Sequence, residues 1–186
     1  KSRCETVADL ICGNGNFKVL CKALKDTGLA ETLDKRHSTW TLFAPTDDAF
    51  ESLDRNIAEE FFNSLKNMEY ILLYHTVKGR ELGSGDLECA VRIQMTNERD
   101  TRTVCLDGKV FQKGSGNKLN KLPQIVEADL EACNGVIHIV NHVILPGSNQ
   151  QPTHKPTPLF PPYYSNYPDN PAPYPAPYPA PYPAPY

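Results

Sequence analysis

Residues 134–146 read Asn-Gly-Val-Ile-His-Ile-Val-Asn-His-Val-Ile-Leu-Pro, a run dominated by β-branched side chains. Such side chains suit a pleated, half-buried strand, so the run predicts an extended segment over Val136–Leu145. Asn134-Gly135 supplies the turn residues that lead into this segment. We therefore expect these residues to complete a β-sheet.

Further short segments upstream are also rich in β-formers. They are Thr39–Ala44, Val91–Met95, Thr101–Leu106, Lys109–Gln112 and Ile125–Leu130. Asp107-Gly108, between two of them, is a strong signal for a two-residue hairpin turn. These segments predict a sheet in which most neighbouring strands run antiparallel.

Helical spacing of apolar residues dominates the first half of the chain. Two short helices are expected between Glu5 and Leu33, with breaks at Gly13 and Gly28. Pro45 ends a strand and Thr46 can cap a helix that runs to Leu53. Ile57–Ser64 and Met68–Tyr74 complete the helices. Helices come first and strands later, so the sequence predicts an α+β fold.

Composition changes after Pro146. All but three of the 17 prolines and all but two of the nine tyrosines lie beyond it, which predicts a domain over 1–147 and a low-complexity tail over 148–186. Pro171–Tyr186 is four copies of Pro-Ala-Pro-Tyr, which favours a disordered tail of polyproline II type. Groove recognition, tyrosine cross-linking, glycosylation after proline hydroxylation and a plain solubilising spacer all stay open as uses.

The six cysteines include no Cys-x-x-Cys pair, so they favour disulfides over a zinc site. A hairpin that turns about Asn97 places Cys89 opposite Cys105, where a disulfide can form. The pairing of the other four, Cys4, Cys12, Cys21 and Cys133, stays open. Disulfides indicate an oxidising compartment, and a first residue other than Met fits a removed signal peptide, so we expect a secreted protein.

Several functional classes find no support in the sequence. A net charge of −3 with mixed signs does not favour nucleic acid, and no apolar run approaches the roughly 20 residues of a membrane helix. His138 and His142 would lie about 13 Å apart on a strand, too far to share a metal ion. Neither a nucleophile elbow nor a zinc-protease motif occurs. We expect no catalysis, cofactor, metal or membrane insertion.

Three segments, in this order, resemble the signature segments of the fasciclin domain family. They are Thr41–Phe50 (Thr-Leu-Phe-Ala-Pro-Thr-Asp-Asp-Ala-Phe), Leu72–Val77 (Leu-Leu-Tyr-His-Thr-Val) and Asn134–Pro146. The resemblance covers about residues 4 to 147. It implies helices packed beside a wedge of two β-sheets, and adhesion or matrix work outside the cell, with a cell-surface or matrix protein or a polysaccharide as partner.

The resemblance also implies two adhesive sites. Tyr74 and His75 match the tyrosine-histidine motif of the family, and Asp129-Leu130 match an acidic-aliphatic dipeptide that contributes to integrin binding in some animal members. Each has a structural alternative. Tyr74 and His75 would otherwise be buried and hydrogen-bonded, fixing a helix against the sheet. Asp129 would otherwise be a solvated turn carboxylate.

The sequence thus favours a secreted, non-enzymatic adhesion or matrix module. Two other functions stay open, and among the partners self-association also stays open. The first function is a carrier of a small apolar ligand such as a carotenoid, and the other is a structural subunit of a larger assembly. The first function rests on algal proteins of this family that hold carotenoids.

Overall fold

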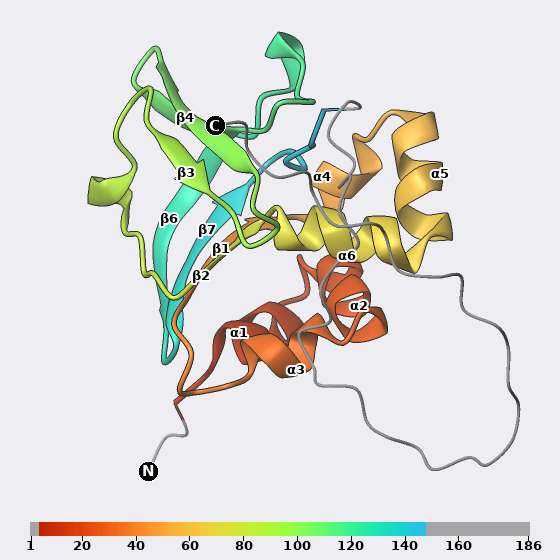
Figure 1. Cartoon of the computed structure of the whole chain (residues 1–186), viewed down its shortest axis with the longest axis vertical. Coiled ribbons are helices and arrows are strands. Elements are labelled where there is room, and N and C mark those ends of the chain that lie inside the picture. The colour runs from red at the N-terminus through yellow and green to blue at the C-terminus, as the bar shows by residue number, and fades with distance from the viewer. Residues whose placement is uncertain (1–3, 148–186) are drawn as a thin grey trace, which may run out of the picture. The chain divides into compact units, whose positions relative to one another are not determined.

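The structure, a computed structural model, describes residues 4–147. Helices gather on one side of this domain and strands on the other (Figure 1). The helices are α1 (Val7–Gly13), α2 (Lys18–Asp26), α3 (Leu29–Leu33), α4 (Asp47–Glu51), α5 (Arg55–Asn63) and α6 (Leu65–Leu73), with 3₁₀ turns η1 (Ser84–Asp86) and η2 (Leu119–Lys121). The strands are β1 (Trp40–Pro45), β2 (Thr76–Lys78), β3 (Arg92–Gln94), β4 (Asp100–Leu106), β5 (Lys109–Lys113), β6 (Ile125–Ala132) and β7 (Gly135–Val140).

The strands form two sheets. The larger has the order β2-β1-β7-β6 and the smaller has the order β3-β4-β5. Strands β1 and β7 run parallel, and every other named pair runs antiparallel. The predicted fold class, α+β with helices beside two mainly antiparallel sheets, is confirmed. The predicted tail over 148–186 lies outside the described residues, so the division into domain and tail stays a prediction.

Strand β1 separates two hydrophobic cores. Its six residues are all buried, and their side chains alternate between the two faces of the sheet. Leu42 and Ala44 join the core beneath the helices. Phe43 joins a second core between the sheets, together with Tyr74, Val77, Leu82, Leu87, Ile93, Met95, Val140 and Ile144. The domain is therefore layered as helices, larger sheet and smaller sheet.

The bounds of several predicted elements shift by a few residues, and the N-terminal helices and the last strand differ most from the prediction. The N-terminal region has three helices rather than two, because Gly28, with φ of 74°, reverses the chain in the left-handed region and starts α3. The last strand ends at Val140 rather than Leu145. Further along, two backbone amides bond to side chains instead of a neighbouring strand: that of Ile144 to His75 and that of Leu145 to Asn117.

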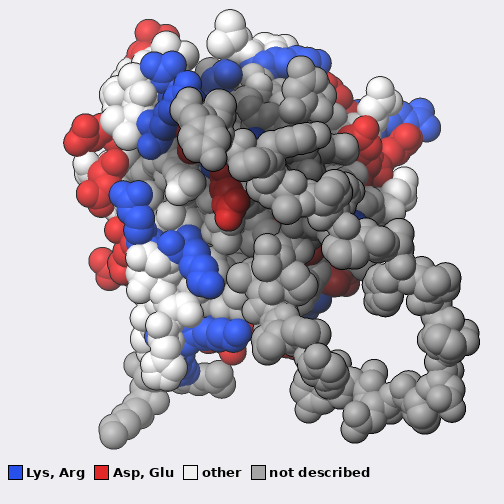
Figure 2. All heavy atoms as spheres, viewed as in Figure 1, with Lys and Arg blue, Asp and Glu red and all other residues white. Residues whose placement is uncertain are grey.

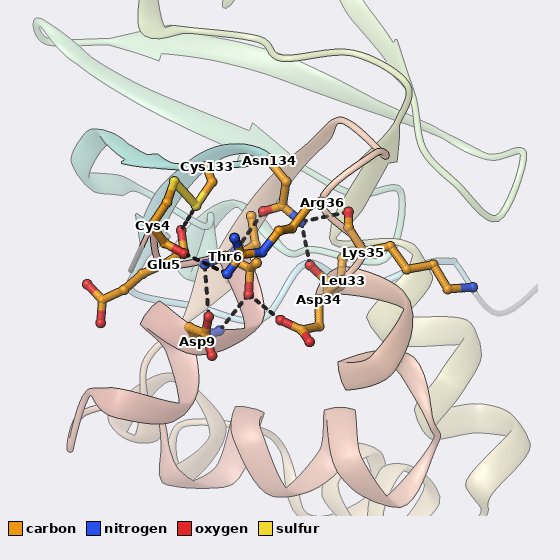
Figure 3. The surroundings of a disulfide bond; sticks show 11 residues. Cys4, Glu5, Thr6, Asp9, Leu33, Asp34, Lys35, Arg36, Cys133 and Asn134 are labelled. Carbon is orange, nitrogen blue, oxygen red and sulfur yellow. Dashed lines mark hydrogen bonds between the residues drawn. A yellow bond between two sulfur atoms is a disulfide. The ribbon is translucent and has the colours of Figure 1, made fainter. Parts of the chain in front are cut away.

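Three disulfides brace the domain. Arg92 pairs with Arg102 and Gln94 with Asp100, which is the register expected for a hairpin about Asn97, and the structure joins Cys89 to Cys105. The remaining cysteines, whose pairing the sequence left open, form Cys4–Cys133 and Cys12–Cys21. The first of these links residues 129 positions apart and ties the start of the domain to the β6–β7 turn (Figure 3).

Asn134, next to that disulfide, joins three segments through its side chain (Figure 3). Its Oδ1 accepts a bond of 2.9 Å from the backbone nitrogen of Val7, at the start of α1. Its Nδ2 donates to the carbonyl oxygens of Leu33, at 2.7 Å, and Lys35, at 3.2 Å. Asn134 is 4% exposed, so this turn residue is a buried tie that seats helices α1 and α3 on the larger sheet.

Candidate functional site

Tyr74 lies at the end of α6 and points between the two sheets. Its side chain is completely buried, and its hydroxyl donates a bond of 2.7 Å to the carbonyl oxygen of Asp100 on β4. The hydroxyl oxygen of Tyr74 in turn accepts a bond of 3.3 Å from the backbone nitrogen of Ser115. Burial raises the pKa of the phenol. Tyr74 therefore joins helix α6 to the smaller sheet and to the 114–117 loop.

His75 is buried beside it, with 1% of the residue exposed, and both ring nitrogens have partners. Nδ1 lies 2.7 Å from the carbonyl oxygen of Ile71, to which it donates. Nε2 accepts a bond of 2.9 Å from the backbone nitrogen of Ile144. These roles require the neutral ring with its proton on Nδ1. Burial disfavours the charged ring and lowers the pKa of His75 to about 4.

The tyrosine-histidine motif thus matches its structural alternative, since it ties α6 to both sheets from inside. Neither side chain is presented to a partner in this conformation. An adhesive role for Tyr74 or His75 stays a prediction, and it would have to act through the shape of the surface that these residues hold in place.

Asp129 lies in a β-bulge of strand β6. The register with β7 shifts between Glu127 and Leu130, so that Ala128 and Asp129 together oppose His138. Asp129 has φ of 60°, in the left-handed region, which aspartate tolerates better than most residues. The bulge turns the carboxylate outward, where it lines an open hollow of about 440 Å³ with Ser84 and Glu131 among its neighbours.

The exposed carboxylate of Asp129 has a fixed position. Oδ1 accepts a bond of 2.7 Å from the backbone nitrogen of Ser84, and Oδ2 accepts one from the Ser84 hydroxyl. The hydroxyl bond and then the backbone bond favour the ionised form and lower the pKa of Asp129. Leu130 has a different environment, because it is half-buried and packs against the core beneath the helices. The dipeptide therefore offers one outward charge and one inward aliphatic group.

His138 holds Asp129 in position. The sequence predicted of this histidine only that it lies too far from His142 to share a metal ion. Its Nε2 donates to the carbonyl oxygen of Leu82 at 2.7 Å, and its Nδ1 accepts from the backbone nitrogen of Asp129 at 3.3 Å. The ring is completely buried and lies tilted against the ring of Phe43, with 5.4 Å between the ring centres. Burial disfavours its charge and lowers its pKa. His138 and Ser84 are site residues that the sequence reasoning missed, since no local pattern links them to Asp129.

The two predicted sites are separate. Tyr74 and His75 bond to α6, β4 and the chain after β7, whereas Asp129 bonds to Ser84 and His138. Within residues 4–147, no cluster of three or more His, Cys, Asp or Glu side chains is arranged to hold a metal ion. None of the helices in that range has both the length and the apolar character needed to cross a membrane.

The fold has a counterpart among solved structures. A domain pair from the insect cell adhesion molecule fasciclin I matches with a TM-score of 0.63 at 17% identity, over 76% of this chain and 51% of that chain. This likeness defines the class of fold as that of a fasciclin domain.

The chain belongs to the fasciclin domain family, whose model matches residues 15–146. It is 35% identical over 148 residues to transforming growth factor-beta-induced protein ig-h3 of Sus scrofa, covering 78% of this chain and 20% of that protein. It is 34% identical to Protein sll1483 of Synechocystis, covering 76% and 73%, and 30% identical to human periostin, covering 70% and 15%. The family is associated with adhesion and matrix proteins. This chain spans about a fifth of the length of ig-h3.

Proposed function

We propose that the chain is a secreted adhesion or matrix module, which binds a cell-surface or matrix protein or a polysaccharide through the surface of its fasciclin domain and performs no catalysis. Family membership supports this proposal. The three disulfides support an extracellular setting, because such bonds persist in oxidising compartments.

The observation that carries the proposal is the fixed, outward carboxylate of Asp129. Two bonds from Ser84 hold it, and His138 holds the bulge from behind. A carboxylate has about four acceptor positions, so sites remain for a partner's cation or amide. Because the group is already ordered, binding does not have to immobilise it, and affinity per contact rises.

An attachment assay tests this proposal. The full chain is immobilised and exposed to cells, to detergent extracts of cell surfaces and to matrix polysaccharides, and the retained material is measured. We expect retention that falls about fivefold or more in Asp129→Asn, which removes one exposed charge. Glu127→Gln is the matched control, because Glu127 is exposed on the same strand and no side-chain bond engages it among the described residues.

Two results would contradict the proposal. One is a folded chain that retains nothing from any of these sources, and the other is reproducible conversion of a substrate. The two alternatives from the sequence stay predictions. A visible absorption band in protein purified from its native source would favour an apolar-ligand carrier, and co-purification at fixed stoichiometry would favour a structural subunit.

A further inference from the structure

The outer face of the smaller sheet carries a row of three cations. Arg92 on β3 lies directly opposite Arg102 on β4, and Arg102 lies directly opposite Lys113 on β5. Directly opposed residues share a face of the sheet, and neighbouring strands lie about 4.8 Å apart. Figure 2 shows Lys and Arg side chains over the part of the surface that β3 and β4 form.

Little within the described residues neutralises this row. Asp100 is the one carboxylate paired with it among residues 4–147, 3.8 Å from Arg92, and the two side chains are 46% and 73% exposed, respectively. Arg102 donates from Nε to the carbonyl oxygen of Ala90 at 3.2 Å, which leaves the rest of its guanidinium outward. Lys113 makes no side-chain bond to any described residue. Like charges directly opposed destabilise a sheet, so the fold itself gains nothing from this arrangement.

An apolar row lies beside the cations on the same face. Val104 on β4 opposes Phe111 on β5, one pair along from Arg102 and Lys113, and both are half-buried. A shallow hollow of about 580 Å³ opens over this area, with Arg92, Arg102, Val104 and Lys113 in its lining. The Cys89–Cys105 disulfide lies at its edge and fixes β4 to the segment before β3.

We propose that this face, defined by Arg92, Arg102, Lys113, Val104 and Phe111, binds an acidic polysaccharide whose sugars carry carboxylates. This inference rests on the proposed function and names the partner class and the surface. The row of cations meets carboxylates repeated along a thin chain, and the apolar row receives the carbon-bound hydrogens of a sugar ring. The sheet fixes the backbone that carries both rows, so binding has to order only the side chains.

The charge distribution favours this occupant over other anions. The basic stripe is narrow, and the chain as a whole has a net charge of −3. A duplex nucleic acid or an anionic membrane spreads negative potential over a broad area and would face more of a chain whose net charge is negative. A single polysaccharide chain can follow the stripe alone.

The test measures binding of the full chain to polygalacturonate in solution over a range of salt concentrations. The variant Arg92→Gln/Lys113→Gln is compared with Lys25→Gln/Lys66→Gln, which makes the same charge change on exposed positions of α2 and α6. We expect the first variant to raise Kd about tenfold and the second to leave it within about twofold. The salt dependence should also become shallower in the first variant only.

Measuring the melting temperature distinguishes a loss of binding from a loss of folding. Because the substitutions relieve like-charge contacts, the melting temperature of Arg92→Gln/Lys113→Gln should stay equal or rise while its binding falls. Equal binding by the sheet variant and the wild type would overturn the inference, as would tighter binding to poly-glutamate, to single-stranded DNA or to phosphatidylserine vesicles. If polygalacturonate does not bind while Asp129-dependent attachment persists, this inference fails and the proposed function stands.

Discussion

The backbone nitrogen of Ser84 and Oδ1 of Asp129 lie 2.7 Å apart, although 45 positions separate the two residues in the chain. This bond and its neighbour from the Ser84 hydroxyl fasten the η1 turn to the bulge of β6. The tie holds an exposed charge in place, so its contributions to stability and to binding can be measured separately.

We expect Asp129→Ala to lower the free energy of unfolding by about 1–2 kcal/mol, because it removes both bonds to Ser84. It also places alanine in the left-handed region, where alanine has no polar side chain to bond to the nearby backbone. Asp129→Gly should cost less, since glycine adopts that conformation freely. Urea unfolding measures both. An alanine variant as stable as Glu127→Ala, the control on the same strand, would contradict the assigned tie.

The two buried histidines predict loss of stability in acid. The unfolded His75 has a pKa of 6.5 and the folded one a pKa of about 4, so the unfolded state binds the proton first. Stability is therefore fully present above pH 6.5 and declines as pH falls towards 4, by about 3 kcal/mol for this group. The lowered pKa of His138 acts in the same direction.

Urea unfolding between pH 4 and pH 7 checks this pH dependence. The variant His75→Gln should be less stable at pH 7 but should lose less stability on acidification. His37→Gln, at an exposed position, is the control and should behave like the wild type. A His75→Gln variant with an unchanged pH dependence would show that other groups govern the acid response.

The disulfides should differ in their contributions. Cys4–Cys133 closes a loop with a sequence separation of 129, whereas Cys12–Cys21 closes one of nine. On the chain-entropy account the first restricts the unfolded state by about 5 kcal/mol and the second by about 3 kcal/mol. We expect Cys4→Ser/Cys133→Ser to lower the melting temperature more than Cys12→Ser/Cys21→Ser. The reverse order in calorimetry would contradict the prediction.

Gly135 should tolerate no side chain. A Cβ there would lie 1.9 Å from the carbonyl oxygen of Trp40, and its φ of 152° is one that side-chain-bearing residues rarely adopt. We expect Gly135→Ala to destabilise the domain by at least about 3 kcal/mol. Gly15→Ala is the control, because nothing lies within 4 Å of its added methyl group. Circular dichroism melting curves compare the two, and similar curves would contradict the close approach.

Local patterns predicted the elements whose signals are local. Thr46 does cap α4 through its side chain, and the β3–β4 register follows from two strands and a short turn. The sequence does not predict strand β2, because three residues are too few to show an alternation of apolar and polar side chains. Ser64 ends α5 and caps α6, although its own segment predicts a helix through it, because this double role depends on where the next helix begins.

Long-range contacts account for what the sequence could not predict. The parallel pairing of β1 with β7 places Trp40 opposite Gly135, and no local sequence pattern in either strand indicates its partner. In the same way Asn134 reads as a turn residue but bonds to α1 and α3, and Asp129 reads as a solvated carboxylate but bonds to Ser84. The sequence therefore indicates which residues belong to the candidate sites. It does not indicate their geometry, because that depends on contacts between distant segments.

The parallel pair at the centre of the larger sheet also bears on synthesis in the cell. Strand β1 leaves the ribosome early, yet the neighbour that covers one whole edge of it is made only when residues 135–140 emerge. Until then the nascent chain exposes one unpaired edge of a mostly apolar strand, which is the kind of segment that aggregates or recruits chaperones. Translation that stops short of β7 should leave the helices without a sheet to pack on, so the domain is completed only close to its final residues.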